Sequence, residues 1–96
     1  MNYDFEWDPN KAESNHRKHG VRFEHATTVF RDPRAVSVLD DTHSKKEDRW
    51  ITLGISAGGR LLAVHHTFEE LNANTVRIRI ISSRRATKRE ASQYGE

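Results

Sequence analysis

The segment from residue 75 to residue 90 constrains the fold most, because a strand pattern runs directly into a helix pattern. Between Thr75 and Ile81 apolar residues alternate with arginines, and this period of two predicts a strand with one face in the core. Arg77 and Arg79 would project from the other face. The predicted helix begins at Arg84 and opens with four cations, which together with free backbone N–H groups favour a phosphate site at the junction.

The rest of the chain divides into short elements separated by turn signals. Asp8-Pro9 predicts a helix start and Gly20 its end, while Gly58-Gly59 predicts a tight hairpin. The predicted elements are a strand over Tyr3–Trp7, helices over Pro9–His19 and Phe23–Phe30, strands over Ala35–Leu39, Arg49–Ile55, Leu61–Phe68 and Thr75–Ser83, and a helix over Arg84–Tyr94. We therefore expect one α+β domain over residues 1–96: an N-terminal strand, two helices, a four-stranded antiparallel meander and a C-terminal helix.

Composition excludes several classes of protein. The 96 residues contain no cysteine, which rules out thiolate catalysis, disulfides and cysteine zinc sites. No apolar run approaches the roughly 18 residues of a membrane span, so we expect a cytoplasmic protein with no membrane partner. Six histidines are present, but no established ligand pattern such as HExxH occurs, and we expect no metal and no cofactor. The net charge of +2 is too small to identify a partner by itself, so the placement of the cations carries the argument.

Two pairs of polar residues are candidates for phosphate chemistry. Lys18 and His19 end the first helix, where unpaired carbonyl groups favour cations; the alternative is a terminus that only stabilises its own helix. Glu47 and Arg49 stand at the entrance of a predicted strand and, two residues apart, could face one ligand. Alternatively, they form an exposed ion pair worth roughly 0 to 1 kcal/mol.

Arginines near the sheet form a third group of candidates. Arg60 follows the predicted glycine turn, and Arg77 and Arg79 lie on one strand face. The planar fork of arginine engages two phosphate oxygens at once, which suits nucleic-acid substrates. The alternative is a solubilising surface charge.

An ordered set of motifs resembles the BrnT toxins of bacterial type II toxin–antitoxin systems. The set covers nearly the whole chain and consists of Phe5-Glu6-Trp7-Asp8-Pro9, Lys18-His19-Gly20-Val21, Phe23-Glu24-His25-Ala26, Arg31-Asp32-Pro33, Glu47-Asp48-Arg49-Trp50 and Arg79-Ile80-Ile81-Ser82-Ser83-Arg84-Arg85-Ala86-Thr87. One departure is Ser83-Arg84-Arg85, where the family more often has alanine, arginine and lysine.

The resemblance implies a RelE-like fold and an endoribonuclease of the mRNA interferase kind that blocks translation. It also implies inhibition by a BrnA-like ribbon-helix-helix antitoxin, in a heterotetramer that binds and represses its own operator DNA. Two alternatives are a non-catalytic nucleic-acid-binding module and an inactive toxin retained as a co-repressor.

Site residues follow from the motifs by position. The expected catalytic residues are Lys18, His19, Glu47, Arg49, Arg60 and Arg79, and the expected RNA-binding residues are Arg77, Arg84, Arg85 and Lys88. Cleavage through the 2′-hydroxyl requires a general base and cations around the phosphorane. Our hypothesis is that Glu47 or His19 is the base and that Arg49, Arg60 and Arg79 hold the phosphorane.

Overall fold

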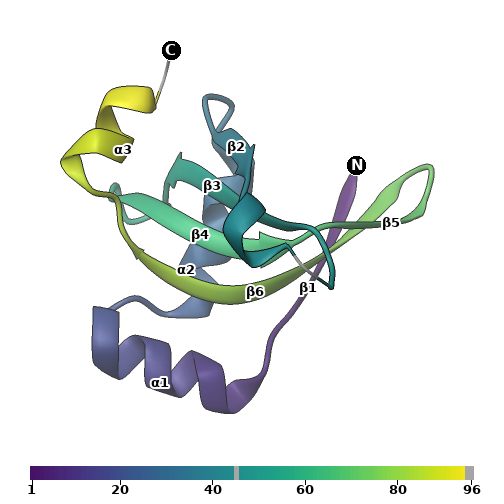
Figure 1. Cartoon of the computed structure of the whole chain (residues 1–96), viewed down its shortest axis with the longest axis horizontal. Helices are drawn as coiled ribbons and strands as arrows, with labels where there is room; N and C mark the ends of the chain where they lie inside the picture. The colour runs from purple at the N-terminus through teal and green to yellow at the C-terminus, as the bar shows by residue number, and fades with distance from the viewer. Residues whose placement is uncertain (45, 95–96) are drawn as a thin grey trace.

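A computed structural model describes residues 1–44 and 46–94, and its centre is a six-stranded sheet (Figure 1). The sheet order is β1-β6-β4-β3-β2, and β5 also pairs with β6. Only β1 and β6 run parallel among these pairs. The elements are β1 (Asn2–Glu6), α1 (Pro9–His19), α2 (Phe23–Ala26), the 3-10 helix η1 (Thr27–Arg31), β2 (Val36–Leu39), the 3-10 helix η2 (Asp41–His43), β3 (Arg49–Ile55), β4 (Leu61–Thr67), β5 (Glu69–Asn72), β6 (Thr75–Arg85) and α3 (Lys88–Gln93).

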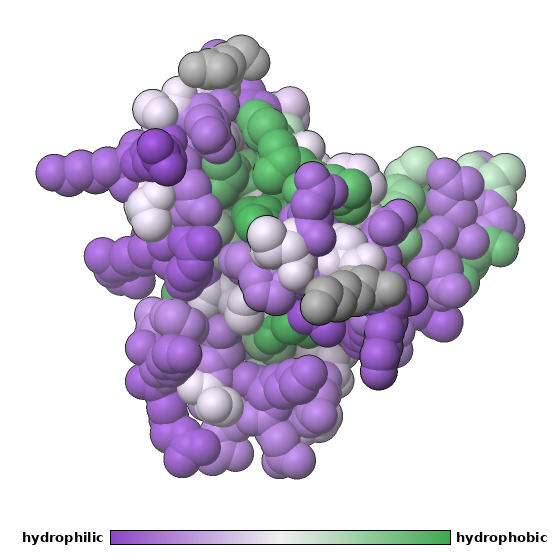
Figure 2. Space-filling model, viewed as in Figure 1, coloured by the Kyte–Doolittle hydropathy of each residue, from purple (hydrophilic) through white to green (hydrophobic). Residues whose placement is uncertain are grey.

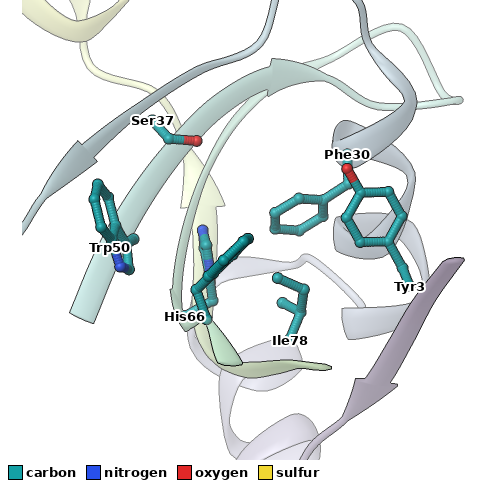
Figure 3. A pocket seen from close by; sticks show the side chains of 7 residues that line it. Tyr3, Phe30, Ser37, Trp50, His66 and Ile78 are labelled. Atoms are coloured by element: carbon teal, nitrogen blue, oxygen red, sulfur yellow. The ribbon is translucent and has the colours of Figure 1, made fainter. Parts of the chain in front are cut away.

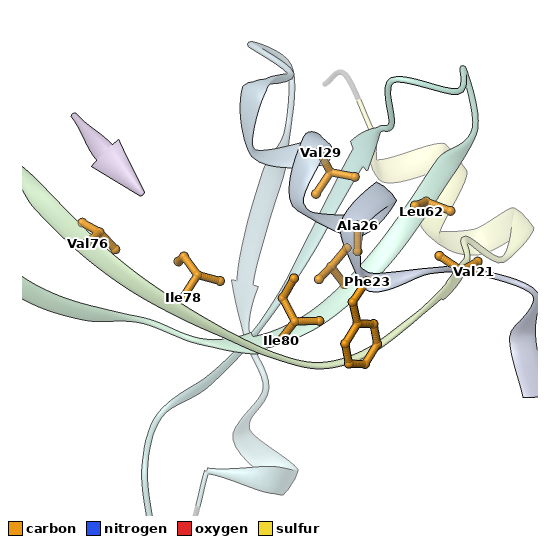
Figure 4. Packing of buried hydrophobic residues seen from close by; sticks show 9 residues of the cluster. Val21, Phe23, Ala26, Val29, Leu62, Val76, Ile78 and Ile80 are labelled. Carbon is orange, nitrogen blue, oxygen red and sulfur yellow. The ribbon is translucent and has the colours of Figure 1, made fainter. Parts of the chain in front are cut away.

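The hydrophobic core lies between one face of the sheet and the segment that contains α2 and η1 (Figure 4). Phe23 is fully buried, as are Ile78 and, to within 1%, Ile80. Burying a side chain of this size contributes about 1.5 to 3 kcal/mol. The alternation in β6 that predicted a buried face is therefore confirmed. The cluster consists of Val21, Phe23, Ala26, Val29, Leu62, Val64, Val76, Ile78 and Ile80.

Helix α1 has the predicted bounds because its end signals are local. The Asp8 side chain accepts a hydrogen bond from the Asn10 N–H at 2.8 Å, Pro9 begins the helix, and Gly20 ends it with φ of 70°. Asn15 fixes the helix to β6. Its side chain accepts a hydrogen bond from the Ser83 N–H at 3.0 Å and donates to the Ser83 carbonyl at 2.9 Å. The end of α1 is thereby held beside the second half of β6.

The predicted boundary between the last strand and the last helix is wrong. Strand β6 continues to Arg85, because Arg84 and Arg85 pair with Ala63 and Leu62 of β4. Helix α3 begins only at Lys88, so the helix does not open with the two arginines. A capping box occupies two backbone N–H groups at this end, those of Thr87 and Glu90. The junction predicted as a phosphate site therefore does not join a helix start to Arg84 and Arg85.

A β-bulge in β6 changes which side chains share a face. His65 pairs with Ser82 but its neighbour His66 pairs with Ile80, so Ile81 is an extra residue in β6. If the side chains of β6 alternated strictly, Ser83 and Arg85 would lie on the same face of the sheet as Arg79. Because of the bulge, Ser82 and Arg84 lie on that face instead, and Ser83 points into the protein, where it is fully buried.

Three further differences concern short elements. The second helix turns into the 3-10 helix η1 after Ala26, and its 3-10 part extends to Arg31. The first strand ends at Glu6, before Trp7. Strand β5 was not predicted, because its exposed polar residues have no buried face; it forms by pairing with the start of β6. No helix within the described ranges is long and apolar enough to cross a membrane.

Candidate functional site

Three rows of paired residues run across β3, β4 and β6 on the sheet face opposite α2. Row one contains Arg49, Thr67 and Arg79. Arg49 pairs with Thr67, and Thr67 lies opposite Arg79 because the neighbouring residues His66 and Ile80 are paired. Row two joins Ile51, His65 and Ser82, and row three joins Leu53, Ala63 and Arg84. We call the surface formed by Arg49, His65, Arg79 and Arg84 the arginine face. In Figure 1 helix α3 lies beside the end of β4, and in the same view Figure 2 shows a largely hydrophilic surface with a hydrophobic area within it.

Arg79 and Glu47 form an ion pair at the edge of the arginine face. The Nη2 atom of Arg79 donates to Glu47 Oε1, and both side chains are about two-fifths exposed, at 43% and 42%. Glu47 lies in a bend before β3, so it does not share a strand face with Arg49 as expected. The structure still brings the two together, because both line a surface hollow with Thr42, His43 and Lys46.

Arg49 is partly exposed and lines the same hollow as Glu47. Its Nε atom is buried and makes no hydrogen bond to the described residues, so this atom is not open to an anion from outside. The exposed part of the guanidinium can still contact an oxyanion such as phosphate, which arginine favours. Among the predicted catalytic residues, Glu47, Arg49 and Arg79 therefore form one group.

Asp40, at the start of η2, holds two histidines close to this group. Its Oδ2 atom lies 2.8 Å from Nδ1 of His43 and 3.9 Å from Nδ1 of His65. Burial raises the pKa of the Asp40 carboxyl, but hydrogen bonds from Thr42 and His43 outweigh this effect, and the pKa lies below its ordinary value. Asp40 is consequently an anion at neutral pH.

His65 is a neutral imidazole at pH 7. Burial lowers its pKa, the nearby Arg84 guanidinium lowers it further, and Asp40 only partly opposes these effects. The side chain remains 24% exposed. His65 is therefore a weakly basic, partly accessible group in the middle row of the arginine face.

Arg84 is fixed by a bidentate ion pair with Glu90 of α3. Its Nη1 and Nη2 atoms donate to the two carboxylate oxygens at 2.7 and 3.0 Å. Hydrogen bonds from Arg84, together with those from Thr87, lower the pKa of Glu90 to about 2. This pair, with a hydrogen bond from the Tyr94 hydroxyl to Asp32, attaches a helix that has few apolar residues.

Glu90→Gln tests this attachment, since glutamine can keep the hydrogen bond to the Thr87 N–H while the charge is lost. A carboxyl whose pKa is lowered on folding stabilises the protein above its unfolded value of 4.5, and this contribution disappears as the pH falls towards 2. We expect the urea midpoint of the variant to be lower than that of the wild type at pH 7 and nearly equal at pH 2. A difference that stays constant over this range would contradict the assignment.

Four other predicted site residues lie outside the group formed by Glu47, Arg49 and Arg79. Lys18 and His19 line a hollow that also contains Ile81 and Ser82, so the end of α1 lies beside β6. Arg85 is exposed at the end of β6, and Lys88 is exposed at the start of α3.

Arg60 and Arg77 do not join the group. Arg60 follows the hairpin turn, seven residue steps along the β3–β4 ladder from Arg49, which is about 24 Å at 3.4 Å per residue. It lines a different hollow, with His16 and Arg22. Arg77 is engaged by three carboxylates, with Asp4 at 3.0 Å and Glu6 and Glu69 within 4.0 Å.

The sequence places His65 and His66 on opposite faces of a strand, and either was interpreted as a packed or surface histidine, so His65 was not predicted as a site residue. His66 is buried on the core face, and burial lowers its pKa to about 4. Its Nδ1 donates to the Thr67 carbonyl at 2.9 Å, which leaves Nε2 as the acceptor for the Thr52 hydroxyl at 2.6 Å. The period of two from Leu62 and Val64 to His66 was the available signal that His65 faces the other way.

An apolar pocket of about 250 Å³ lies on the core face of the sheet (Figure 3). Its lining contains no lysine or arginine, so it is not a site for phosphate. Within the described ranges, no group of three or more histidine, aspartate or glutamate side chains is arranged to hold a metal ion. The pocket is lined by Tyr3, Phe30, Ser37, Trp50, His66, Phe68 and Ile78.

Comparison with known proteins identifies the class and then the family. The small α+β fold is similar to that of the crystal structure of the Brucella abortus ribonuclease toxin BrnT, with a TM-score of 0.58 and 23% sequence identity, over 92% of this chain and 100% of that chain. Residues 7–90 match the family described as the ribonuclease toxin BrnT of type II toxin–antitoxin systems. The chain therefore belongs to the BrnT family. No curated protein matches the sequence.

Proposed function

We propose that this chain cleaves RNA on its arginine face without a metal ion and thereby inhibits translation. The observation that supports this most is the group formed by Glu47, Arg49 and Arg79, in which Glu47 pairs with Arg79 and lines one surface hollow with Arg49. Cations fixed before substrate arrives stabilise a phosphorane without reorganising, and such fixed charges are commonly the largest single contribution to catalysis.

Each predicted residue has a role in this proposal. Arg49 and Arg79 hold the phosphate that reacts, and Glu47 orients Arg79. Residues around the group contact the flanking phosphates: Lys18, His19, Arg84, Arg85 and Lys88. Arg60 and Arg77 contact only longer RNA, because Arg60 opens onto a separate hollow and Arg77 is already neutralised by acids.

The proposed regulator is a BrnA-like ribbon-helix-helix antitoxin that covers the arginine face and so blocks access of RNA. Toxin and antitoxin would form a heterotetramer that binds operator DNA through the antitoxin and represses its own synthesis. The RelE-like character of the fold is part of the same proposal. It rests on the family, which is that of type II toxin–antitoxin systems.

The proposal is tested by comparing labelled RNA with a matched strand in which every ribose is 2′-deoxy. We expect only the RNA to be cut and the upstream product to end in a 2′,3′-cyclic phosphate, because the internal hydroxyl is the nucleophile. Tight, salt-dependent binding of both strands without cleavage, on free RNA and on translating ribosomes, would contradict the proposal and indicate a nucleic-acid-binding module.

A further inference from the structure

We propose that His65 is a catalytic residue of this ribonuclease, the general base that takes the proton of the attacking 2′-hydroxyl. The inference rests on the proposed function and assigns a role that the motif comparison did not give to this position. Its basis is the place of His65 in the rows of the arginine face and its contact with Asp40.

The geometry places His65 between the cations that would hold the substrate. His65 lies in row two, with Arg49 and Arg79 in row one and Arg84 in row three. Neighbouring rows on one sheet face are two residues apart, about 7 Å, which is within reach of a single nucleotide bound across them. A phosphate held by the row-one arginines would therefore bring its ribose next to this imidazole.

Asp40 acts on His65 through its charge. Its Oδ2 atom lies 3.9 Å from His65 Nδ1, which is too long for a hydrogen bond but close enough for the carboxylate to favour the protonated imidazole. A nearby carboxylate therefore stabilises the imidazolium that forms in the reaction.

The charged groups that face His65 leave it unprotonated in the resting protein. They come from three elements: Asp40 and His43 from the η2 region, Arg84 from β6, and Glu90 from α3. Burial, Arg84 and His43 lower its pKa, whereas the two carboxylates raise it, and the balance lies below the ordinary value of 6.5. A base must be unprotonated to act, and His65 meets that condition at neutral pH.

The chemical step then balances. The 2′-hydroxyl proton moves to the unprotonated ring nitrogen of His65, the 2′-oxygen forms a bond to phosphorus, and the bond from phosphorus to the 5′-oxygen breaks. The departing oxygen takes a proton from water. The products are a 2′,3′-cyclic phosphate and a 5′-hydroxyl, and the imidazolium returns its proton to water.

The two bases expected from the motifs are placed less favourably. Glu47 accepts a hydrogen bond from the Arg79 guanidinium, which occupies one of its oxygens. His19 lines a hollow between α1 and β6, beside Ile81 and Ser82, and has no place in the three rows. Of the three groups, His65 alone lies within the rows that hold the cations.

The test uses single-turnover cleavage of labelled RNA by the wild type, His65→Ala, Asp40→Asn and the control His25→Ala, over a range of pH. His25 is exposed on α2, behind the sheet. We expect His65→Ala to lower the rate about 10²- to 10⁴-fold, the usual contribution of a general base. Its Kd for the 2′-deoxy strand should be unchanged, and His25→Ala should cleave at the wild-type rate.

The pH profile separates a base from a merely structural residue. The wild-type rate should fall as the pH decreases below 6.5, and Asp40→Asn should shift this fall to lower pH, because Asp40 raises the pKa of His65. The residual cleavage rate of His65→Ala should not decrease over this pH range. If His65→Ala cleaves at the wild-type rate while Arg79→Ala does not, the inference is wrong and the proposed function stands. If the wild type does not cleave RNA at all, both are wrong.

Discussion

Arg79→Ala is expected to lower the rate of RNA cleavage by about 10²- to 10³-fold, the loss seen when one fixed donor to a developing oxyanion is removed. Arg79 lies across β4 from Arg49, so one phosphate can contact both guanidinium groups. Arg79→Lys should recover part of the rate, because lysine keeps the charge but loses the bidentate fork. Single-turnover kinetics with a labelled RNA measure the cleavage rates of the wild type, Arg79→Ala and Arg79→Lys.

The matched control is Arg17→Ala, which removes a guanidinium from the exposed surface of α1, where the side chain is 74% exposed. Arg17→Ala should cleave like the wild type, and the urea midpoints of both variants should be close to the wild-type value. A folded Arg79→Ala that cleaves as fast as Arg17→Ala would contradict the placement of the reacting phosphate.

Asn15→Ala is expected to lower the free energy of unfolding by about 3 kcal/mol or more. The side chain of Asn15 makes three buried hydrogen bonds, two with the backbone of Ser83 and one with the carbonyl of Val21 at 3.1 Å. Each buried polar group left without a partner costs roughly 1 to 3 kcal/mol. Urea unfolding followed by far-UV circular dichroism measures the change.

Ser14→Ala is the control for this prediction, because Ser14 is an exposed neighbour on the same helix. Its effect should be within about 0.5 kcal/mol of the wild type, as for most surface substitutions. If Asn15→Ala is no more destabilising than Ser14→Ala, α1 is held to β6 by something other than this amide.

The parts of the fold that were predicted correctly are those whose signals are local. Helix α1 has a capping aspartate, a first-turn proline and a terminal glycine, and its bounds agree with the prediction. Strand β3 also has the predicted bounds, Arg49–Ile55. The end of β6 depends instead on pairing with residues about twenty positions earlier in β4, and no local pattern encodes the bulge at Ile81.

The candidate site was predictable in its residue types but not in its pairings. Arg79 and Glu47 are 32 residues apart, and only the folded sheet brings them into contact. Arg60 was expected in the same group, yet the β3–β4 hairpin puts its turn at the opposite end from Arg49. His65 was missed because its contact with Asp40 depends on the path of the chain through η2.

The most direct test of the central claim is incubation of the protein, free of any partner, with labelled RNA in excess EDTA. A metal-independent active site on the arginine face predicts that cleavage proceeds at the same rate with and without the chelator, and that Arg79→Ala removes it in both conditions. Cleavage that stops on chelation, or that persists in the folded Arg79→Ala variant, would contradict the claim.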